Sequence, residues 1–495
     1  MFLAIALTSS RAQVEMEQPA LDEIAQNETK VATPPSDGEP QSASSDNTGP
    51  PSSNVSPDAN FGFSIAQPPP GTPGFFLLGL FLSESFQTET ATQGDSSQNF
   101  FSTRVSGNLD LLKFWHRSVT ALDYVGGGIF YSLHDTEQLQ TLNVSHSFLG
   151  QKRELTFADS LSNLPGGSFG AAPFGGAGLY SLVFAGTGAG IQPGSGLANL
   201  FGSTTLAGIA EGQQITNIAM AEFTQALTPR SVISVAGGYG ITDYYGQSKN
   251  LINNSQLSTL ARYSYLLSPR SQIGVIYGYR SFQFPEVTEG QVTTDLVQLV
   301  YQRQFSHRMT FSFGAGPEFT ALRRQYRLTI PPEGPLCPSV NPCVISFTAT
   351  THQINASAFA LLAYRLRTTS FTISYDRLVT SGSGLVAGAN SDIVVFSVGG
   401  PISAVWQANV NAGYVRNSSI AETSPGIPAE SYQNGYAGIA VRRGLGQHFS
   451  FLASYQFNAL GYTSSCAQLN ICGGITRQNT GLIGLYWNFR PVRLD

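Results

Sequence analysis

The side chains that most often act as bases, nucleophiles or metal ligands are few in this sequence. Six histidines are scattered through it, and none forms an H-x-x-x-H or H-E-x-x-H pair. The Gly-rich stretch GGSFGAAPFGGAG (166–178) lacks the Lys-Ser/Thr ending of a phosphate-binding loop. These observations predict a protein that is not an enzyme and has no resident metal or cofactor.

Four cysteines form two local pairs with the same spacing, Cys337 with Cys343 and Cys466 with Cys472. Each pair lies in a Pro- or Gly-bearing stretch between strand-like segments, and no further Cys or His is close enough to complete a zinc site. We therefore expect two small disulfides in an oxidising compartment, with free thiols as the alternative.

The remaining candidates are polar side chains in segments that alternate apolar and polar residues. In MTFSFGAGPEF (309–319), for example, Phe311, Phe313 and Phe319 alternate with Ser312 and Glu318. A period of two indicates a β-strand with two different faces. If the strand belongs to a membrane β-barrel, we expect the phenylalanines to contact lipid. The polar side chains, with Thr310, would then face a watery lumen.

The same alternation in other segments selects charged and amide side chains that we expect to line a lumen. An Arg that faced lipid at the membrane midplane would cost about 2 to 4 kcal/mol, which favours the interior. The alternative is that these side chains only pair across the wall and brace it. The predicted pore-lining residues are Arg262, Arg280, Gln298, Glu318, Asp376, Gln407, Asn409, Asn411 and Arg442.

Three residues do not fit this alternation: Asp123 and Arg377 fall on the apolar set of their segments, and Pro317 interrupts one. Local bulges would reconcile them by shifting the alternation. Aromatic side chains gather near segment ends, as in 243–245, 282–284 and 486–489, which suits aromatic girdles at the two membrane interfaces. The alternative is the ordinary preference of aromatic residues for β-strands.

Composition limits the class of protein. Charged residues make up 12% of the 495 residues, about half the usual share, and the net charge of -5 does not suit nucleic-acid binding. After the N-terminus there is no run of about 20 apolar residues, so we expect no membrane-spanning helix. Membrane β-strands escape this test, because their alternating faces average to neutral hydropathy.

The chain divides into four parts. Residues 1–12 have a short apolar run and a small-x-small pattern typical of a signal peptide, but no positive residues precede the run, which predicts a start codon further upstream. Residues 13–73 are rich in Pro, Ser and acidic residues, and we expect a disordered periplasmic segment. Residues 74–490 carry the alternating segments, and 491–495 form a C-terminal tail.

Tight and long connections alternate strictly between the segments, as expected for antiparallel hairpins. Eighteen segments are counted, with 16 as the competing count because 138–212 is ambiguous. Many are longer than the usual 5 to 6 residues of soluble strands. The segments are 75–87, 99–112, 118–132, 138–149, 152–160, 213–227, 231–245, 255–267, 271–284, 291–305, 308–322, 347–366, 369–381, 390–400, 403–417, 431–443, 447–462 and 476–490.

The last segment, TGLIGLYWNF (480–489), places Gly481, Ile483, Leu485, Trp487 and Phe489 on one face. It is similar to the C-terminal strand signal that the barrel assembly machinery reads, except that RPVRLD follows Phe489. Tight turns with Pro-Arg, as in LTPRS and LSPRS, resemble the beta-barrel porin and uncharacterised outer-membrane beta-barrel groups of bacteria. The resemblance covers about 74–490 and implies a transmembrane antiparallel up-and-down barrel in the outer membrane of a Gram-negative-type bacterium.

The sequence thus predicts an all-β barrel of about 18 strands that acts as a porin-like channel for passive diffusion of small hydrophilic solutes. The alternatives are a non-conducting barrel that serves as a structural or adhesion scaffold, and a secreted soluble β-protein. Expected partners are outer-membrane lipid, the barrel assembly machinery and small hydrophilic solutes, with no nucleic acid. A homo-oligomer is left open.

Overall fold

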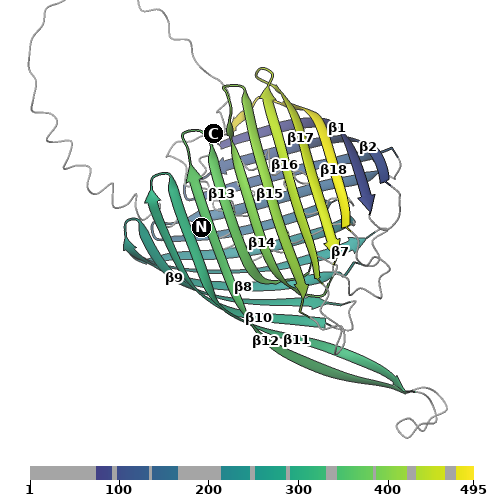
Figure 1. Cartoon of the computed structure of the whole chain (residues 1–495). Coiled ribbons are helices and arrows are strands. Elements are labelled where there is room, and N and C mark those ends of the chain that lie inside the picture. The colour runs from purple at the N-terminus through teal and green to yellow at the C-terminus, as the bar shows by residue number, and fades with distance from the viewer. Residues whose placement is uncertain are drawn as a thin grey trace, which may run out of the picture.

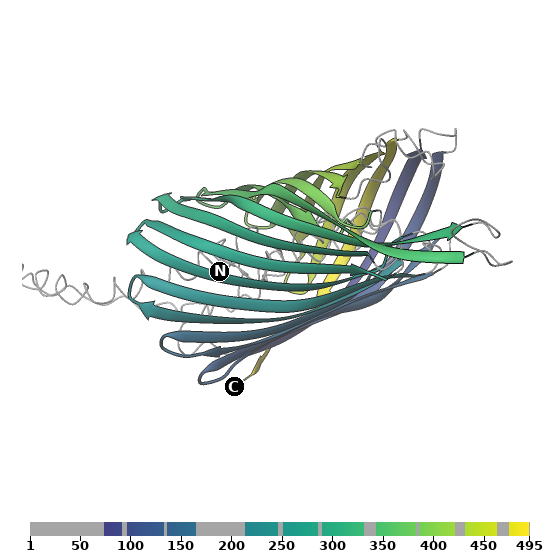
Figure 2. The ribbon, with the colours of Figure 1, turned by 90° about the horizontal axis from the view of Figure 1, so that it is seen from below.

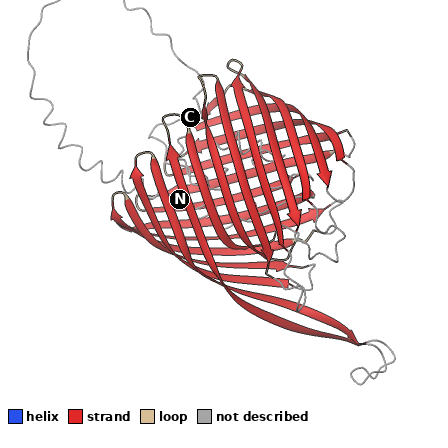
Figure 3. Cartoon of the chain, in the orientation of Figure 1, coloured by secondary structure: helices blue, strands red, loops and turns tan. Residues whose placement is uncertain are grey.

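The structure is a computed structural model that describes residues 74–91, 97–132, 136–164, 213–245, 251–285, 290–330, 343–382, 386–420, 431–462 and 475–494. Figure 3 shows that strands dominate these residues, and none of their elements is a helix able to cross a membrane. The strands are β1 (Gly74–Ala91), β2 (Ser97–Phe114), β3 (Ser118–Tyr131), β4 (Glu137–Leu149), β5 (Arg153–Leu164), β6 (Gln213–Thr228), β7 (Ser231–Tyr245), β8 (Asn254–Ser268), β9 (Ser271–Phe284), β10 (Gly290–Ser306), β11 (Met309–Ile330), β12 (Cys343–Arg365), β13 (Ser370–Thr380), β14 (Ala389–Pro401), β15 (Trp406–Ser419), β16 (Ser431–Gly444), β17 (Phe449–Tyr462), β18 (Ile475–Asn488) and β19 (Val492–Leu494).

Each of the strands β1 to β17 pairs antiparallel with the strand that follows it in the chain. β18 then pairs with β1 over Gly79–Ala91, which closes the sheet. Figures 1 and 2 show the strands wrapping round in this order. The fold is an all-β, closed antiparallel barrel of 18 strands, so the predicted count is confirmed and the count of 16 is wrong.

The short β19 closes the base of the seam between the first and last long strands. Val492, Arg493 and Leu494 pair with Phe76, Phe75 and Gly74 of β1. The residues that we expected to form only a tail after Phe489 therefore extend the sheet. This pairing places both ends of the barrel on the side of the tight turns.

β11 and β12 are longer than the sequence indicated, and together they form a hairpin that projects beyond the wall (Figure 1). β12 pairs with β13 only from Ala358 to Arg365, whereas its pairing with β11 reaches Cys343. Over its first part β12 therefore has β11 as its strand partner, and the wall is lower on the β13 side. Beyond Arg377, β13 is therefore paired with β14 and no longer with β12.

The two faces of each strand differ as expected for a membrane barrel. In β8, Leu257, Tyr263 and Leu267 are exposed, while the side chains of the alternate set, including Ser258 and Arg262, are buried. In a closed barrel alternate side chains point outside and inside, so the exposed apolar set forms the exterior. Such an exterior is suited to lipid and contradicts a secreted soluble protein.

The three residues that broke the alternation need no bulge. The β10–β11 register is unchanged across Pro317, since Leu296 faces Glu318 and Leu299 faces Ala315. Pro317 lies on the outer face and is exposed. The bulge hypothesis is therefore wrong here, and the backbones approach closely instead: a Cβ on Gly316 would lie 1.8 Å from the carbonyl oxygen of Val297.

Asp123 and Arg377 are also accommodated without a register shift. Asp123 faces the interior beside its cross-strand partner Asp110. Arg377 lies outside, with 48% of its side chain exposed, and its Nε is 3.8 Å from Asp392 Oδ1. Both charges thus have a polar neighbour on the adjacent strand.

The aromatic girdle is confirmed only in part. At the end of β18, Trp487 and Phe489 are outside, and their ring centroids are 4.4 Å apart. Phe282 and Phe284, however, are fully buried on the inner face. The expectation that they belong to a lipid-facing girdle is wrong, because they share the face of Arg280.

Candidate functional site

Three charged side chains from different strands meet on the inner wall. Arg280 (β9) interacts electrostatically with Glu318 (β11) and Asp376 (β13). Arg280 and Glu318 are 6% and 1% exposed. Charges this deeply buried are stable only when they are paired and hydrogen bonded. The cluster therefore links three parts of the wall that are not consecutive in the sheet.

The backbone of Val379 lies between two of these charges. Arg280 Nη1 donates a hydrogen bond to the Val379 carbonyl oxygen at 3.2 Å, and the Val379 N–H donates to Glu318 Oε2 at 3.2 Å. This geometry requires β13 to leave β12 after Arg377 and to cross the inner face of β11. We call residues 378–382 and 386–389 the inward turn.

Polar contacts attach the inward turn to the neighbouring wall as well. Tyr432 Oη (β16) donates to the Gly382 carbonyl oxygen at 3.1 Å. The hydroxyls of Thr380 and Ser391 are 2.7 Å apart, and Ser391 donates to the side-chain oxygen of Asn417. The inward turn is thus held by β9 and β11 on one side and by β14 to β16 on the other.

Backbone conformation makes glycine necessary at two positions of the inward turn. Gly382 and Gly388 have φ of 83° and 81°, values that other residues rarely adopt. At Gly382 a Cβ would also lie 2.2 Å from the Val386 carbonyl oxygen. The sequence therefore permits this tight inward path only because both positions lack a side chain.

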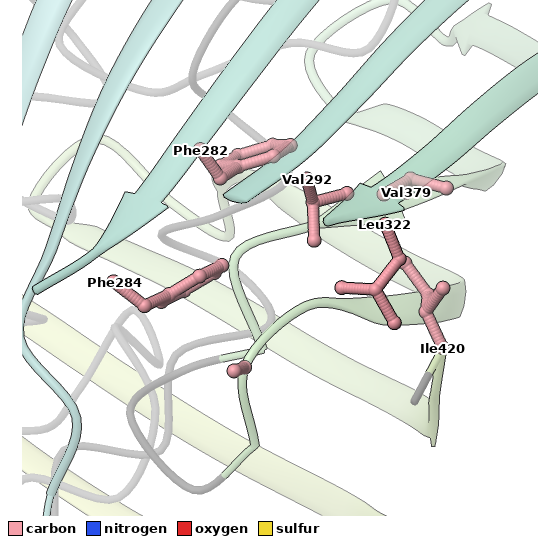
Figure 4. Packing of buried hydrophobic residues seen from close by; sticks show 7 residues of the cluster. Phe282, Phe284, Val292, Leu322, Val379 and Ile420 are labelled. Carbon is pink, nitrogen blue, oxygen red and sulfur yellow. The ribbon is translucent and has the colours of Figure 1, made fainter. Parts of the chain in front are cut away.

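An apolar cluster packs around the inward turn (Figure 4). Phe282, Val292 and Leu322 come from the inner faces of β9, β10 and β11, and Val379 packs against them. Burial of such side chains contributes about 1.5 to 3 kcal/mol each. The inward turn is consequently fixed by apolar packing in addition to its hydrogen bonds.

Other predicted interior residues lie on the inner face but outside this cluster. Arg262 (β8) interacts electrostatically with Glu222 (β6). Gln298 Nε2 donates to Ser357 Oγ at 2.6 Å. Each of these contacts spans one intervening strand of the β6–β12 wall, β7 in the first case and β11 in the second.

The other wall carries the remaining candidates. Gln407, Asn409 and Asn411 alternate along β15, with Gln407 exposed at the tight-turn end and Asn411 buried. Arg442 Nε donates to Ser450 Oγ at 3.1 Å, and its guanidinium lies 5.5 Å from the ring centre of Tyr486. The four predicted disulfide cysteines lie outside the residues whose side chains are described.

The sequence reasoning missed several charged groups of the interior. Arg104 and Asp110 lie on the inner face of β2, and the alternation of STRVSGNLD (102–110) could have found both. Glu222 has a weaker signal of the same kind, because its alternate set in β6 holds Thr216 and Thr224 but also Ile218 and Met220. Within the described ranges, no three His, Cys, Asp or Glu side chains are grouped as a metal site.

Many interior polar atoms have no hydrogen-bond partner among the described residues, including Oε1 of Gln272 and Gln302, Oγ1 of Thr320 and Oδ1 of Asn434. Each such atom costs about 1 to 3 kcal/mol if it stays unpaired. A hydrated interior would remove this cost.

Positive charge is concentrated at the tight-turn end of the barrel. Half of the 26 Lys and Arg residues lie there. The described residues at this end contain one carboxylate, Glu154. They are residues 113–118, 150–154, 228–231, 268–271, 303–309, 365–370, 401–406, 443–449 and 489–494. We call these cations the basic rim: Lys113, Arg117, Lys152, Arg153, Arg230, Arg270, Arg303, Arg308, Arg365, Arg367, Arg443, Arg490 and Arg493.

No family model matches the chain, and no curated protein matches it in sequence. Similar solved structures include the Escherichia coli ferric-catecholate import receptor Fiu, with 12% identity, a TM-score of 0.42, and 86% of this chain and 83% of that chain covered. OpdL of Pseudomonas aeruginosa has 10% identity and a TM-score of 0.39, with 85% and 99% covered. A BenF-like porin from Pseudomonas fluorescens Pf-5 has 8% identity and a TM-score of 0.40, with 85% and 99% covered.

The geometry of the chain itself defines its class. The 18 strands close, the exterior is apolar and the interior carries charged and amide side chains. These features belong to barrels whose outside contacts lipid. The chain is therefore an outer-membrane-type β-barrel.

Proposed function

We propose that the barrel is a channel for passive diffusion of small hydrophilic solutes. The observation that carries this proposal is the polar inner face, with buried Ser, Thr, Asn and Gln side chains on strands around the whole barrel. Polar atoms without protein partners favour water in the interior. A barrel of 16 to 18 strands is wide enough for an aqueous channel.

In this proposal the inward turn sets the width of the path, and nearby charges set its selectivity. The turn crosses the inner face next to Arg280, Glu318 and Asp376. The side chains of Gln407, Asn409 and Asn411 on β15 and of Arg442 on β16 would line the path on the other side. Because both signs of charge are present, we expect a weak preference between small cations and anions.

Single-channel recording in a planar bilayer tests the proposal. The full chain is refolded, and a shift in gel mobility between unboiled and boiled samples checks that the barrel has formed. Steady conductance steps that scale with salt concentration support an open channel. Arg280→Gln should then change the ratio of cation to anion permeability. Folded protein without conductance would refute the proposal.

A non-conducting scaffold is the second candidate. It is favoured by the attachment of the inward turn to both sides and by the apolar packing of Val379. If these contacts block the path, removing them should create conductance. Val379→Gly combined with Glu318→Gln is the variant to record. Conductance that appears only in this variant would support a barrel closed by its own chain.

A further inference from the structure

The basic rim forms the boundary of the barrel on one side only. Barrels of this class have short turns on the periplasmic side, so the rim faces the inner leaflet of the outer membrane. Glu154 is the one carboxylate among the described rim segments, and it belongs to the inner-facing set of β5. Among the described residues, the outer circumference at this level therefore carries a net positive charge.

Large apolar side chains accompany these cations in the tight turns. Leu227, Leu267 and Phe305 are 53%, 54% and 50% exposed, and each is within three residues of a rim arginine. A purely aqueous surface would not favour such exposure. Apolar and cationic groups side by side are typical of the boundary between acyl chains and headgroups.

Three cations of the rim lie over outward aromatic rings. Lys113 Nζ is 5.4 Å from the ring centre of Trp115, and Arg443 Cζ is 5.2 Å from that of Trp406. The Arg303 guanidinium is 5.2 Å from the ring centre of Phe305. These contacts direct the cations along the outside of the barrel, toward the lipid headgroups.

We propose that the basic rim binds the phosphate groups of anionic phospholipids. Guanidinium groups match phosphate geometry, and each Lys or Arg near an anionic surface adds to the attraction. The rival occupant is the chain's own segment 13–73, which has nine Asp and Glu residues and one Lys. The outward aromatic contacts and exposed apolar turns favour lipid over an acidic peptide.

The three tryptophans of the chain, Trp115, Trp406 and Trp487, all lie at the tight-turn end, so they report on this region alone. Energy transfer from Trp to a dansyl-labelled lipid measures which lipid gathers there. The full chain is placed in phosphatidylcholine vesicles with a small, equal fraction of dansyl-labelled phosphatidylglycerol or phosphatidylcholine. We expect transfer about twofold or more higher with labelled phosphatidylglycerol, and a loss of the difference at high salt.

A matched pair of triple variants locates the binding. Lys113→Gln, Arg443→Gln and Arg490→Gln together remove a cation near each tryptophan and should abolish the difference. Arg323→Gln, Arg416→Gln and Arg477→Gln remove exposed cations near the long-connection ends and should retain it. Gel mobility checks folding of each variant. The salt titration of the unmodified chain gives an independent reading if one variant does not fold.

Two results would overturn the proposal. One is equal transfer from both labelled lipids in the unmodified folded protein at low salt. The other is a preference that survives the rim variant. If transfer from both lipids is equal, a further variant tests the rival occupant: the nine acidic residues of 13–73 are replaced by amides in the full chain. A preference that then appears assigns the rim to that segment instead of to lipid.

Discussion

Replacing Glu318 by Gln should loosen the inward turn without opening the barrel wall. Glu318 accepts hydrogen bonds from the backbone N–H of Val379 at 3.4 and 3.2 Å, and it interacts electrostatically with Arg280. Gln keeps the size of the side chain and can still accept one bond. The change therefore removes charge and little else.

The structure gives the size of the effect. A hydrogen bond to a charged group contributes about 1.5 to 3 kcal/mol and one to a neutral group about 0.5 to 1.5 kcal/mol, so the exchange of one for the other costs about 1 to 1.5 kcal/mol. Asp376 still faces Arg280 after the substitution, so the larger cost of an entirely unpaired buried charge does not apply. Local opening of the inward turn should become about 5 to 12 times more frequent, since 1.4 kcal/mol corresponds to a factor of ten.

Hydrogen–deuterium exchange of the folded protein measures this opening. Peptides that contain Val379 or Val386 should exchange faster by that factor, while peptides of β2 to β4 should not change. Glu84→Gln is the control, because Glu84 is exposed and accepts a bond from Thr103 at 2.7 Å. Unchanged exchange at Val379, or equal acceleration in both variants, would refute this account of the inward turn.

Three further predictions follow from single positions. Gly382→Ala should destabilise the inward turn by about 1 to 2 kcal/mol, because its φ is 83°, and it should accelerate the same exchange; Gly444→Ala, where a Cβ meets nothing within 4 Å, should have no such effect. Leu299→Arg on the exterior, where Leu299 is 59% exposed, should cost about 2 to 4 kcal/mol in a urea titration from vesicles, and Gln298→Arg on the interior should cost less; equal costs would contradict the assigned faces. Asp123→Asn should change the stability of the barrel by less than about 1 kcal/mol in the same titration, because an amide can donate the hydrogen bond that joins residue 123 to Asp110 directly opposite; a larger loss would contradict this pairing.

Period-two alternation and Pro-Arg turns were sufficient to predict the strands, because each tight turn fixes the register of its hairpin. β9 spans Ser271–Phe284, as expected from the sequence. β11 runs on to Ile330, however, through Arg323 and Arg324, which read as a polar connection. The predicted strand ends before these charges. In the structure, pairing with β12 continues β11 past them to Ile330.

The sequence predicts which side chains face the interior, but it does not predict which of them contact one another. The alternation that puts Arg280 inside also puts Phe282 and Phe284 inside, so their assignment to a girdle gave aromatic composition too much weight. The contact of Val379 with Arg280 and Glu318 depends on β13 leaving β12 after Arg377, while β13 stays paired with β14 as far as Thr380. A pattern within one strand contains no information on such a crossing.

The seam between β1 and β18 has a consequence for how the chain folds. Every other long pairing joins neighbours in the chain, whereas this one joins Thr88 to Asn479, whose side chains also bond across 391 residues. Local hairpins form in microseconds, but contacts between distant residues are slow because the chain must first lose much more entropy. Until closure, the growing sheet has two unpaired edges that can join other chains. Protection of those two edges is therefore the step at which assembly of this barrel succeeds or fails.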